Sequence, residues 1–324
     1  MKPLDGKVAV VAGATRGAGR GIATMLGEAG ATVYCTGRSV RGRQSDMGRS
    51  ETIEETAELV TAHGGQGIPV RVDHTVEEEV KALFERIRAE QNGQLDILVN
   101  DVWGGESLTQ WGAAFWEHSL ANGLRMQQQA VHSHMMTSYY GAPLMVARRQ
   151  GIIIEITDGI DYRYRGNLYY SLAKISAIHL SAAMAEDLRP HGVTAVAVTP
   201  GFLRSEEMLD HFGVTEENWR AAGKKEPHFL MSETPVYIGR ALAALAADPD
   251  KLDMSGKSLS TWGLSERYPF TDADGSRPHW GNYAKEQGIG QPAVLQAAGG
   301  EKNREPEHPG SRPLPAGEPP WKLG

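Results

Sequence analysis

Short runs of apolar residues alternate along the chain with longer segments in which apolar residues recur at three- and four-residue spacing. Each short run predicts a buried strand, and each periodic segment predicts a helix that packs one face on a sheet. We expect strands at Lys7–Ala12, Thr32–Thr36, Ile68–Val72, Leu95–Asn100, Gly151–Ile156, Val193–Thr199 and Lys257–Thr261. We expect helices at Gly17–Ala29, Glu51–Ala62, Val76–Glu90, in a long region that follows residue 112 and ends near Arg149, after Asn167, and at Pro235–Ala247.

Strict alternation of strands and helices gives βαβ units, a parallel sheet and helices on both of its faces. Because such crossovers are right-handed, the expected fold class is α/β, a doubly wound parallel sheet of the Rossmann type in a single domain. That domain spans residues 1–262 and includes a substrate loop at about 201–233. Residues 263–324 form a C-terminal extension, rich in Gly, Pro, Glu and Lys toward its end, that we expect to be disordered from about residue 297.

The composition indicates a globular protein of the cytoplasm. The 324 residues are 40% hydrophobic, and a net charge of -7 argues against nucleic acid as the main partner. The single cysteine, Cys35, excludes an intramolecular disulfide and suits a reducing compartment. No apolar run approaches the length that spans a membrane, so no membrane partner is expected. We predict no metal site.

A glycine-rich loop follows the first strand and opens a helix, in the pattern G-x-x-x-G-x-G. Glycines there permit a tight turn and let backbone N–H groups approach a pyrophosphate at the helix N-terminus. The loop therefore predicts a dinucleotide site. Its expected cofactor-binding residues are Gly13, Thr15, Arg16, Gly17, Ala18 and Gly19.

The end of the second strand indicates which dinucleotide binds. A carboxylate there would favour the ribose 2′-hydroxyl of NAD, whereas an arginine accommodates the 2′-phosphate of NADP. The chain has Arg38 and Ser39 at this point and no carboxylate, so NADP(H) is the expected cofactor.

Tyr170 and Lys174 lie four residues apart on a predicted helix for which Asn167 is a plausible N-cap, so both side chains project from one face. A lysine beside a tyrosine favours the phenolate and lowers a pKa that is ordinarily about 10. The pair therefore predicts a general acid or base that works near neutral pH.

These motifs, in this order and spacing, resemble the short-chain dehydrogenase/reductase family over about residues 5–262, and within it a bacterial subgroup similar to the animal dehydrogenase/reductase member 1 proteins. The resemblance rests on the glycine loop, Asp73 after the third strand, Asn100 after the fourth, Tyr170-x-x-x-Lys174, and Pro200-Gly201 after the sixth. It implies a seven-stranded Rossmann sheet, a homo-oligomer, and Lys174 on the nicotinamide ribose. It also implies cofactor contacts by Asp73 and His74 near the adenine, Asn100 near the adenosine ribose, and Pro200, Gly201 and Leu203 near the nicotinamide.

Two stretches depart from the family pattern. The family's serine, which hydrogen-bonds the substrate oxygen, falls where this chain has Thr157 and Asp158. We expect Thr157 to supply the hydroxyl, because a carboxylate cannot donate and would raise the tyrosine pKa. Asp158 is then either a turn residue or a catalytic group of another kind. The helix-four asparagine of the family has no clear counterpart; the candidates are Asn122, Ala130, Ser133 and His134.

Aromatic residues suggest a small-molecule substrate of apolar or aromatic character, although they also suit loop packing or a subunit contact. They are Trp103, Trp111, Phe115, Trp116, Tyr162 and Tyr164. The expected function is an NADP(H)-dependent oxidoreductase that reduces a carbonyl or oxidises a secondary alcohol, with Tyr170 as general acid/base. The alternatives are a dehydratase or isomerase that uses Asp158 as base, or a non-catalytic NADP-binding sensor.

Overall fold

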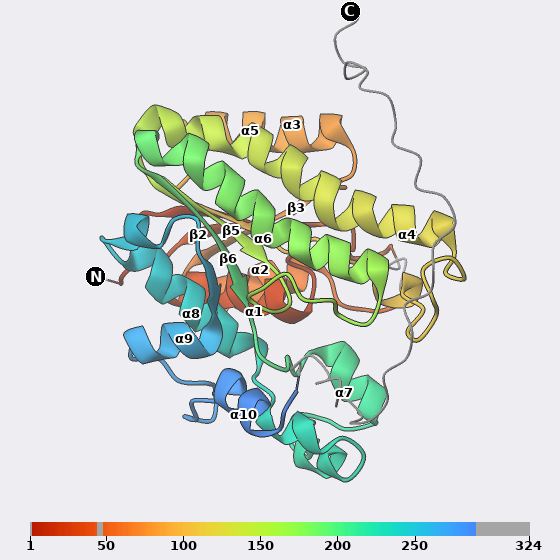
Figure 1. The fold of residues 1–324 in the computed structure, drawn as a ribbon. Coiled ribbons are helices and arrows are strands. Elements are labelled where there is room, and N and C mark those ends of the chain that lie inside the picture. Colours follow the sequence, from red (N-terminus) through yellow and green to blue (C-terminus); the bar gives the residue numbers. More distant parts are fainter. Residues whose placement is uncertain (1, 44–47, 290–324) are drawn as a thin grey trace, which may run out of the picture.

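Seven parallel strands in the order β3-β2-β1-β4-β5-β6-β7 form the centre of the structure, a computed structural model that describes residues 2–43 and 48–289 (Figure 1). The chain moves outward from β1 to β3, then returns to β4 on the other side of β1. The strands are β1 (Val8–Ala12), β2 (Thr32–Gly37), β3 (Gln66–Arg71), β4 (Ile97–Asn100), β5 (Gly151–Ile156), β6 (Val193–Thr199) and β7 (Ser258–Ser260). The predicted doubly wound α/β fold, with its single domain, is confirmed.

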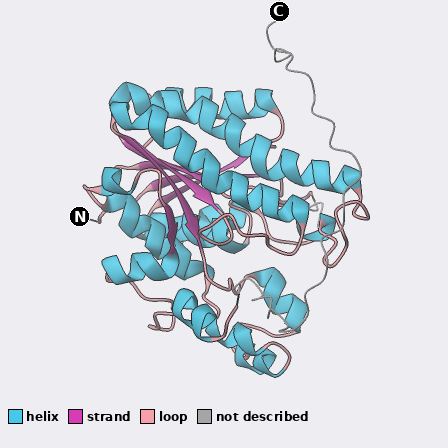
Figure 2. Cartoon of the chain, viewed as in Figure 1, coloured by secondary structure: helices cyan, strands magenta, loops and turns pink. Residues whose placement is uncertain are grey.

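Helices cover both faces of the sheet, which lies between two helical layers (Figure 2). One layer contains α1 (Gly17–Glu28), α2 (Ile53–Ala62), α8 (Pro235–Ala247) and α9 (Thr261–Arg267). The other contains α3 (Glu77–Glu90), α5 (Ser133–Arg148) and α6 (Leu168–Leu188), with α4 (Leu120–Gln127) continuing α5 toward the N-terminus.

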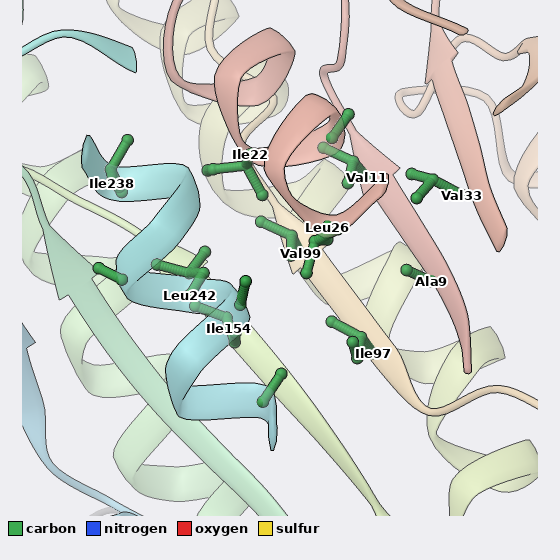
Figure 3. Close-up of a cluster of buried hydrophobic side chains, with 14 of the residues drawn as sticks. Ala9, Val11, Ile22, Leu26, Val33, Ile97, Val99, Ile154, Ile238 and Leu242 are labelled. Carbon is green, nitrogen blue, oxygen red and sulfur yellow. The ribbon is translucent and has the colours of Figure 1, made fainter. Parts of the chain in front are cut away.

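The core forms because alternate residues of each strand face opposite layers. In β1, Ala9 and Val11 face α1 and α8, whereas Val8 and Val10 face α3 and α5. Figure 3 shows the first of these clusters, where Ile22 and Leu26 of α1 meet Leu242 of α8 above the strands. Because both faces are buried, the strands read as continuous apolar runs in the sequence.

The long helical region differs from its expected form at two places. Residues 113–119 are not helical, and α4 begins only at Leu120, where the Ser119 hydroxyl caps the Asn122 N–H at 3.3 Å. The helix is then interrupted by a π-helical turn, Gln128–His132, before α5 begins. Such turns often occur at functional sites.

Residues 201–233 fold into α7 (Glu206–Phe212) and two short 3₁₀ turns around a small core of their own, centred on Trp219 and Phe229. The described part of the C-terminal extension includes α10 (Trp280–Glu286), which the sequence did not predict. Asp272 of the extension accepts hydrogen bonds from the Thr234 N–H and hydroxyl at the start of α8. The extension is thus held to the sheet domain through Asp272. The segment expected to be disordered, from about residue 297, lies outside the described residues.

Within the described ranges, no helix is both long enough and apolar enough to cross a lipid bilayer, and no group of three or more histidine, cysteine or acidic side chains is arranged to hold a metal ion.

The contact between α1 and α8 depends on glycine. A Cβ atom at Gly21 would lie 2.1 Å from the Pro235 carbonyl oxygen. We expect Gly21→Val to lower the free energy of unfolding by at least about 1–3 kcal/mol, the usual cost of overpacking a core. Urea denaturation measures this. Ala62→Val adds bulk at an exposed helical position and serves as the control. Equal midpoints for the two variants would contradict the expectation.

Candidate active site

A cavity of about 1110 Å³ opens at the carboxyl ends of the strands. The loops that follow six successive strands contribute to its wall, through Gly13, Arg38, Asp73, Asp101, Asp158 and Pro200. Ligands of doubly wound sheets bind at this edge, beside the point where the strand order reverses.

The glycine-rich loop is held by close backbone contacts. Gly13 has a φ of +93°, and a Cβ there would lie 2.5 Å from the Asp101 carbonyl oxygen. A Cβ at Gly19 would lie 2.2 Å from the Gly13 carbonyl oxygen. Gly13, Thr15, Arg16, Gly17 and Ala18 all border the cavity, whereas Gly19 does not. Gly19 therefore serves packing, and its expected direct contact with the cofactor is not supported.

The N-terminus of α1 already holds an anionic group. The Gly17 N–H donates to the Glu206 carboxylate of α7 at 2.8 Å, and the same carboxylate lies 4.0 Å from the Arg20 Nε. Helix N-termini favour negative charge because their first N–H groups lack partners within the helix. These donors thus fit the pyrophosphate of a dinucleotide.

Positive charge gathers at the ends of β2 and β3. Arg38 borders the cavity and lies 3.8 Å from the Asp73 carboxylate, while Arg16 donates to the Ser39 hydroxyl at 3.4 Å. Although burial opposes it, hydrogen bonds from Thr75 and the charge of Arg38 lower the pKa of Asp73. These side chains form a cationic rim with one carboxylate, where the adenine end of a dinucleotide would lie.

The side chains of two residues expected to bind the cofactor, His74 and Asn100, are hydrogen-bonded within the protein. Both ring nitrogens of His74 already have partners, the hydroxyls of Thr36 at 2.7 Å and Thr137 at 2.9 Å. Burial lowers the pKa of His74 to about 3, so the ring is a neutral part of the core, although the residue borders the cavity. Asn100 has no exposed surface and does not border the cavity.

The Asn100 amide nitrogen instead donates to the Ser138 hydroxyl at 2.9 Å and to the Glu155 carboxylate at 2.7 Å. The other Glu155 oxygen lies 2.6 Å from His134 Nδ1, and His134 Nε2 meets the Val102 carbonyl at 3.0 Å. His134 is therefore committed to this buried network. The following residue, Asp101, faces the cavity, where burial raises its pKa to about 7.

The π-helical turn brings Gln129 to the cavity wall. Its side chain is 5% exposed, and the Oε1 atom has no hydrogen-bond partner among the described residues. The candidates suggested for this region by sequence lie elsewhere: Asn122 and Ala130 do not border the cavity, and the Ser133 hydroxyl bonds the Gln129 carbonyl. No sequence pattern marks a π-helical turn, so Gln129 was missed.

Tyr170 and Lys174 share the cavity, as the motif predicts, with the Asn167 side chain capping their helix at the Tyr170 N–H. The Tyr170 hydroxyl donates to the Asp158 carboxylate at 2.8 Å. The Thr157 hydroxyl is buried and donates to the Lys174 carbonyl at 2.6 Å. Thr157 borders the cavity, but in this structure its hydroxyl hydrogen is used within the protein, so the expected donation to a substrate oxygen would need that bond to be exchanged. Asp158 occupies the place beside the tyrosine.

The electrostatics of Tyr170 also differ from expectation. Burial in the cavity wall and the neighbouring Asp158 carboxylate raise the pKa of Tyr170 well above its ordinary value, and Arg165 only partly opposes them. The Lys174 ammonium lies 5.6 Å from the Tyr170 ring centre and 4.4 Å from that of Trp103. Tyr170 thus keeps its proton, and the predicted lowering of its pKa by lysine does not occur in the protein alone.

Aromatic rings surround this pair on one side. Trp103 packs edge-on against Tyr170, with ring centres 5.4 Å apart, and Trp111 lies 5.1 Å away. Both border the cavity. The other aromatic residues predicted for the pocket do not border it and are more than half exposed, namely Phe115, Trp116, Tyr162 and Tyr164.

Comparison with known proteins gives a consistent result. The family profile described as short chain dehydrogenase matches residues 7–213. The chain is 37% identical over 276 residues to the human dehydrogenase/reductase SDR family member 1, an alignment that covers 84% of this chain and 85% of that protein. It is 30% identical over 206 residues to 7alpha-hydroxysteroid dehydrogenase of Escherichia coli, covering 63% of this chain and 74% of that protein.

A crystal structure of hydroxysteroid dehydrogenase from Escherichia coli superimposes with a TM-score of 0.64 at 26% identity, covering 80% of this chain and 97% of that chain. The resemblance drawn from the sequence motifs is thereby confirmed. Members of the group are oxidoreductases that use NAD or NADP. By its fold, its family profile and its relatives, the chain belongs to the short-chain dehydrogenase/reductase family.

Proposed function

We propose that the protein is an NADP(H)-dependent oxidoreductase that interconverts a carbonyl and a secondary alcohol on a small molecule of apolar or aromatic character. The observation that carries this proposal is that Tyr170 and Lys174 share one cavity with the glycine-rich loop. A dinucleotide bound along the strand ends would bring its reactive ring to the tyrosine. Trp103 and Trp111 support an apolar or aromatic substrate, because both rings line the cavity beside Tyr170.

Each part of the cofactor has a group that fits it. The first N–H groups of α1 suit the pyrophosphate, and Arg38 with Ser39 suits a 2′-phosphate. Lys174 would hold the nicotinamide ribose, and Pro200, Gly201 and Leu203 border the remaining part of the cavity. Residues 201–233 would cover the substrate side. Bound there, the cofactor supplies the hydride chemistry, while the protein positions the substrate and moves the proton at the Tyr170 oxygen.

Non-redox chemistry is a second candidate. The contact between Asp158 and Tyr170 gives the site a carboxylate that a ketone reductase does not need. A dehydratase or isomerase would use that carboxylate as base, and a sensor would need neither group. Turnover of alcohols or ketones with a change in NADPH absorbance distinguishes the oxidoreductase from both.

We infer a homo-oligomer of the cytoplasm. A stripe of apolar side chains along α4 and α5 is exposed, formed by Leu120, Leu124, Met135 and Tyr139, and a second copy would cover it.

Cys35 is free and buried, in keeping with the reducing compartment inferred for the protein.

The first test concerns cofactor choice. We expect NADPH to bind more tightly than NADH, and Arg38→Asp to weaken NADPH binding by roughly 10- to 100-fold, since hydrogen bonds to charged groups are worth about 1.5–3 kcal/mol. Isothermal calorimetry with both cofactors measures this. Arg41→Asp is the matched control, because Arg41 pairs with Glu58 outside the cavity. Equal affinities of the unaltered protein for NADPH and NADH would remove the basis of the prediction.

The second test concerns Glu206. Its carboxylate occupies the Gly17 N–H, where it would repel the cofactor phosphates. We expect Glu206→Gln to tighten NADPH binding by roughly tenfold, about 1.4 kcal/mol, within the range of charge effects at a helix N-terminus. Glu217→Gln removes the same charge from an exposed residue of the same loop and should leave the affinity unchanged. Weaker binding by the Glu206 variant would mean that Glu206 supports the site.

The third test concerns catalysis. A panel of secondary alcohols and ketones is assayed for a change in NADPH absorbance. We expect Tyr170→Phe to reduce turnover by roughly 100- to 10000-fold, the usual contribution of a general acid or base, with NADPH affinity nearly unchanged. Tyr169→Phe provides the control on the adjacent helical position. A Tyr170 variant that retains full turnover would refute the proposed role of Tyr170.

A further inference from the structure

The carboxylate of Asp158 accepts the single hydrogen of the catalytic tyrosine. We propose that Asp158 is a catalytic residue: it takes the proton of Tyr170 while Tyr170 takes a proton from a substrate hydroxyl, so that the site acts on alcohols as a dehydrogenase. This inference rests on the proposed function and adds to it the proton acceptor and the working direction of the site.

Asp158 is held in this position by its own loop. The Arg165 guanidinium donates to three carbonyl oxygens of the loop, those of Asp158, Asp161 and Arg163. The Gly159 N–H also donates to the Thr199 hydroxyl of β6 at 2.9 Å. The loop is therefore tied to the sheet and to itself, and the carboxylate has a fixed approach to Tyr170.

Hydrogen-bond complementarity decides which substrate oxygen fits. A carbonyl oxygen only accepts, so it needs a donor, yet the Tyr170 hydrogen is already given to Asp158. A hydroxyl group can donate to the Tyr170 oxygen, which has a free lone pair. Asp158 is exposed to the cavity and adds negative charge there, which disfavours the partly negative oxygen of a ketone.

Other charged groups face the same pair. Lys174 lies on the same helix, Arg165 lies in the same loop, and Glu106 comes from the segment after β4. Asp101 lies beyond them, toward Lys174. Burial and the Asp158 charge together keep the pKa of Tyr170 well above its ordinary value, so Tyr170 is protonated when the substrate arrives. It passes one proton on as it accepts another, without first becoming a phenolate.

Oxidation of an alcohol at this site moves two protons and one hydride. The substrate O–H bond breaks and its proton joins the Tyr170 oxygen; the Tyr170 O–H bond breaks and its proton joins the Asp158 carboxylate. The carbinol C–H bond breaks, its electron pair leaves as hydride to an oxidised nicotinamide dinucleotide, and the C=O bond forms. Asp158 then releases its proton to solvent through the open cavity.

One arm of the test needs no substrate. The ionisation of Tyr170 is followed by ultraviolet difference absorbance against Tyr170→Phe, with and without the Asp158→Asn substitution. We expect Asp158→Asn to move the Tyr170 transition to lower pH by at least one unit, a tenfold change in its ionisation constant. An unchanged transition would show that the carboxylate does not act on the tyrosine and would overturn the proposal.

The second arm uses the alcohol and ketone pair with the highest turnover in the panel. We expect reduction by the unaltered enzyme to fall as the pH rises, because reduction consumes a proton that must arrive through Asp158, and oxidation to vary less with pH. In Asp158→Ser the profiles should exchange: reduction becomes flat and oxidation rises with pH. Asp161→Asn, in the same loop but paired with Arg163 at the surface, should keep the original profiles.

The outcomes separate the two proposals. Profiles of Asp158→Ser that match those of the unaltered enzyme would overturn the role of Asp158 while leaving the oxidoreductase intact. If NADPH binds but no alcohol or ketone is turned over, the proposed function fails, and the dehydrogenase direction inferred here fails with it. The absorbance arm would still show whether Asp158 controls the tyrosine proton.

Discussion

Glu155 places a carboxylate in the middle of the sheet with no exposed surface, and side chains of two other elements meet it there. Asn100 approaches from β4 and His134 from α5, each within hydrogen-bond distance. Because the Val102 carbonyl can only accept, His134 Nε2 carries a hydrogen. The contact between His134 Nδ1 and the Glu155 carboxylate needs a second hydrogen. Glu155 and His134 therefore satisfy each other's hydrogen-bonding groups in the core. Breaking such a buried pair by removing one partner usually costs about 3–5 kcal/mol.

This network determines the shape of the substrate side of the cavity. Through the Val102 carbonyl, His134 fixes the turn that leaves β4 and so places the two residues on either side, Asp101 and Trp103. Asp101 packs against the glycine-rich loop, and Trp103 contacts the Tyr170 ring. The turn after β4, its contact with the glycine-rich loop and the aromatic wall thus depend on one buried carboxylate.

The sequence predicted the central strands well because β1, β4, β5 and β6 are buried on both faces and read as apolar runs. Gly151–Ile156 and Val193–Thr199 agree residue for residue with β5 and β6. Side-chain direction beyond a strand end was harder to predict. Strand periodicity ceases at Ile156, so nothing local shows whether Thr157 or Asp158 faces the cavity. The Thr157 hydroxyl donates to the backbone carbonyl of Lys174, 17 positions along the chain.

Contacts between distant segments explain the other differences. Glu206 reaches Gly17 across 189 positions, and His74 is turned into the core by Thr137, 63 positions away. Such pairings depend on how long loops return to the sheet, and neither periodicity nor motif spacing encodes them. Motifs identified the residues at the strand ends, but only packing shows which of them remain available to a ligand.

The position of the tryptophans has a spectroscopic consequence. The chain has seven, and four of them border the cavity: Trp103, Trp111, Trp262 and Trp280. Two come from the segment after β4 and two from the C-terminal helices α9 and α10. More than half of the tryptophans of the chain therefore lie at the wall of the cavity, where energy transfer to a reduced nicotinamide would be efficient. A change in tryptophan fluorescence would therefore report what occupies the cavity, without an added label.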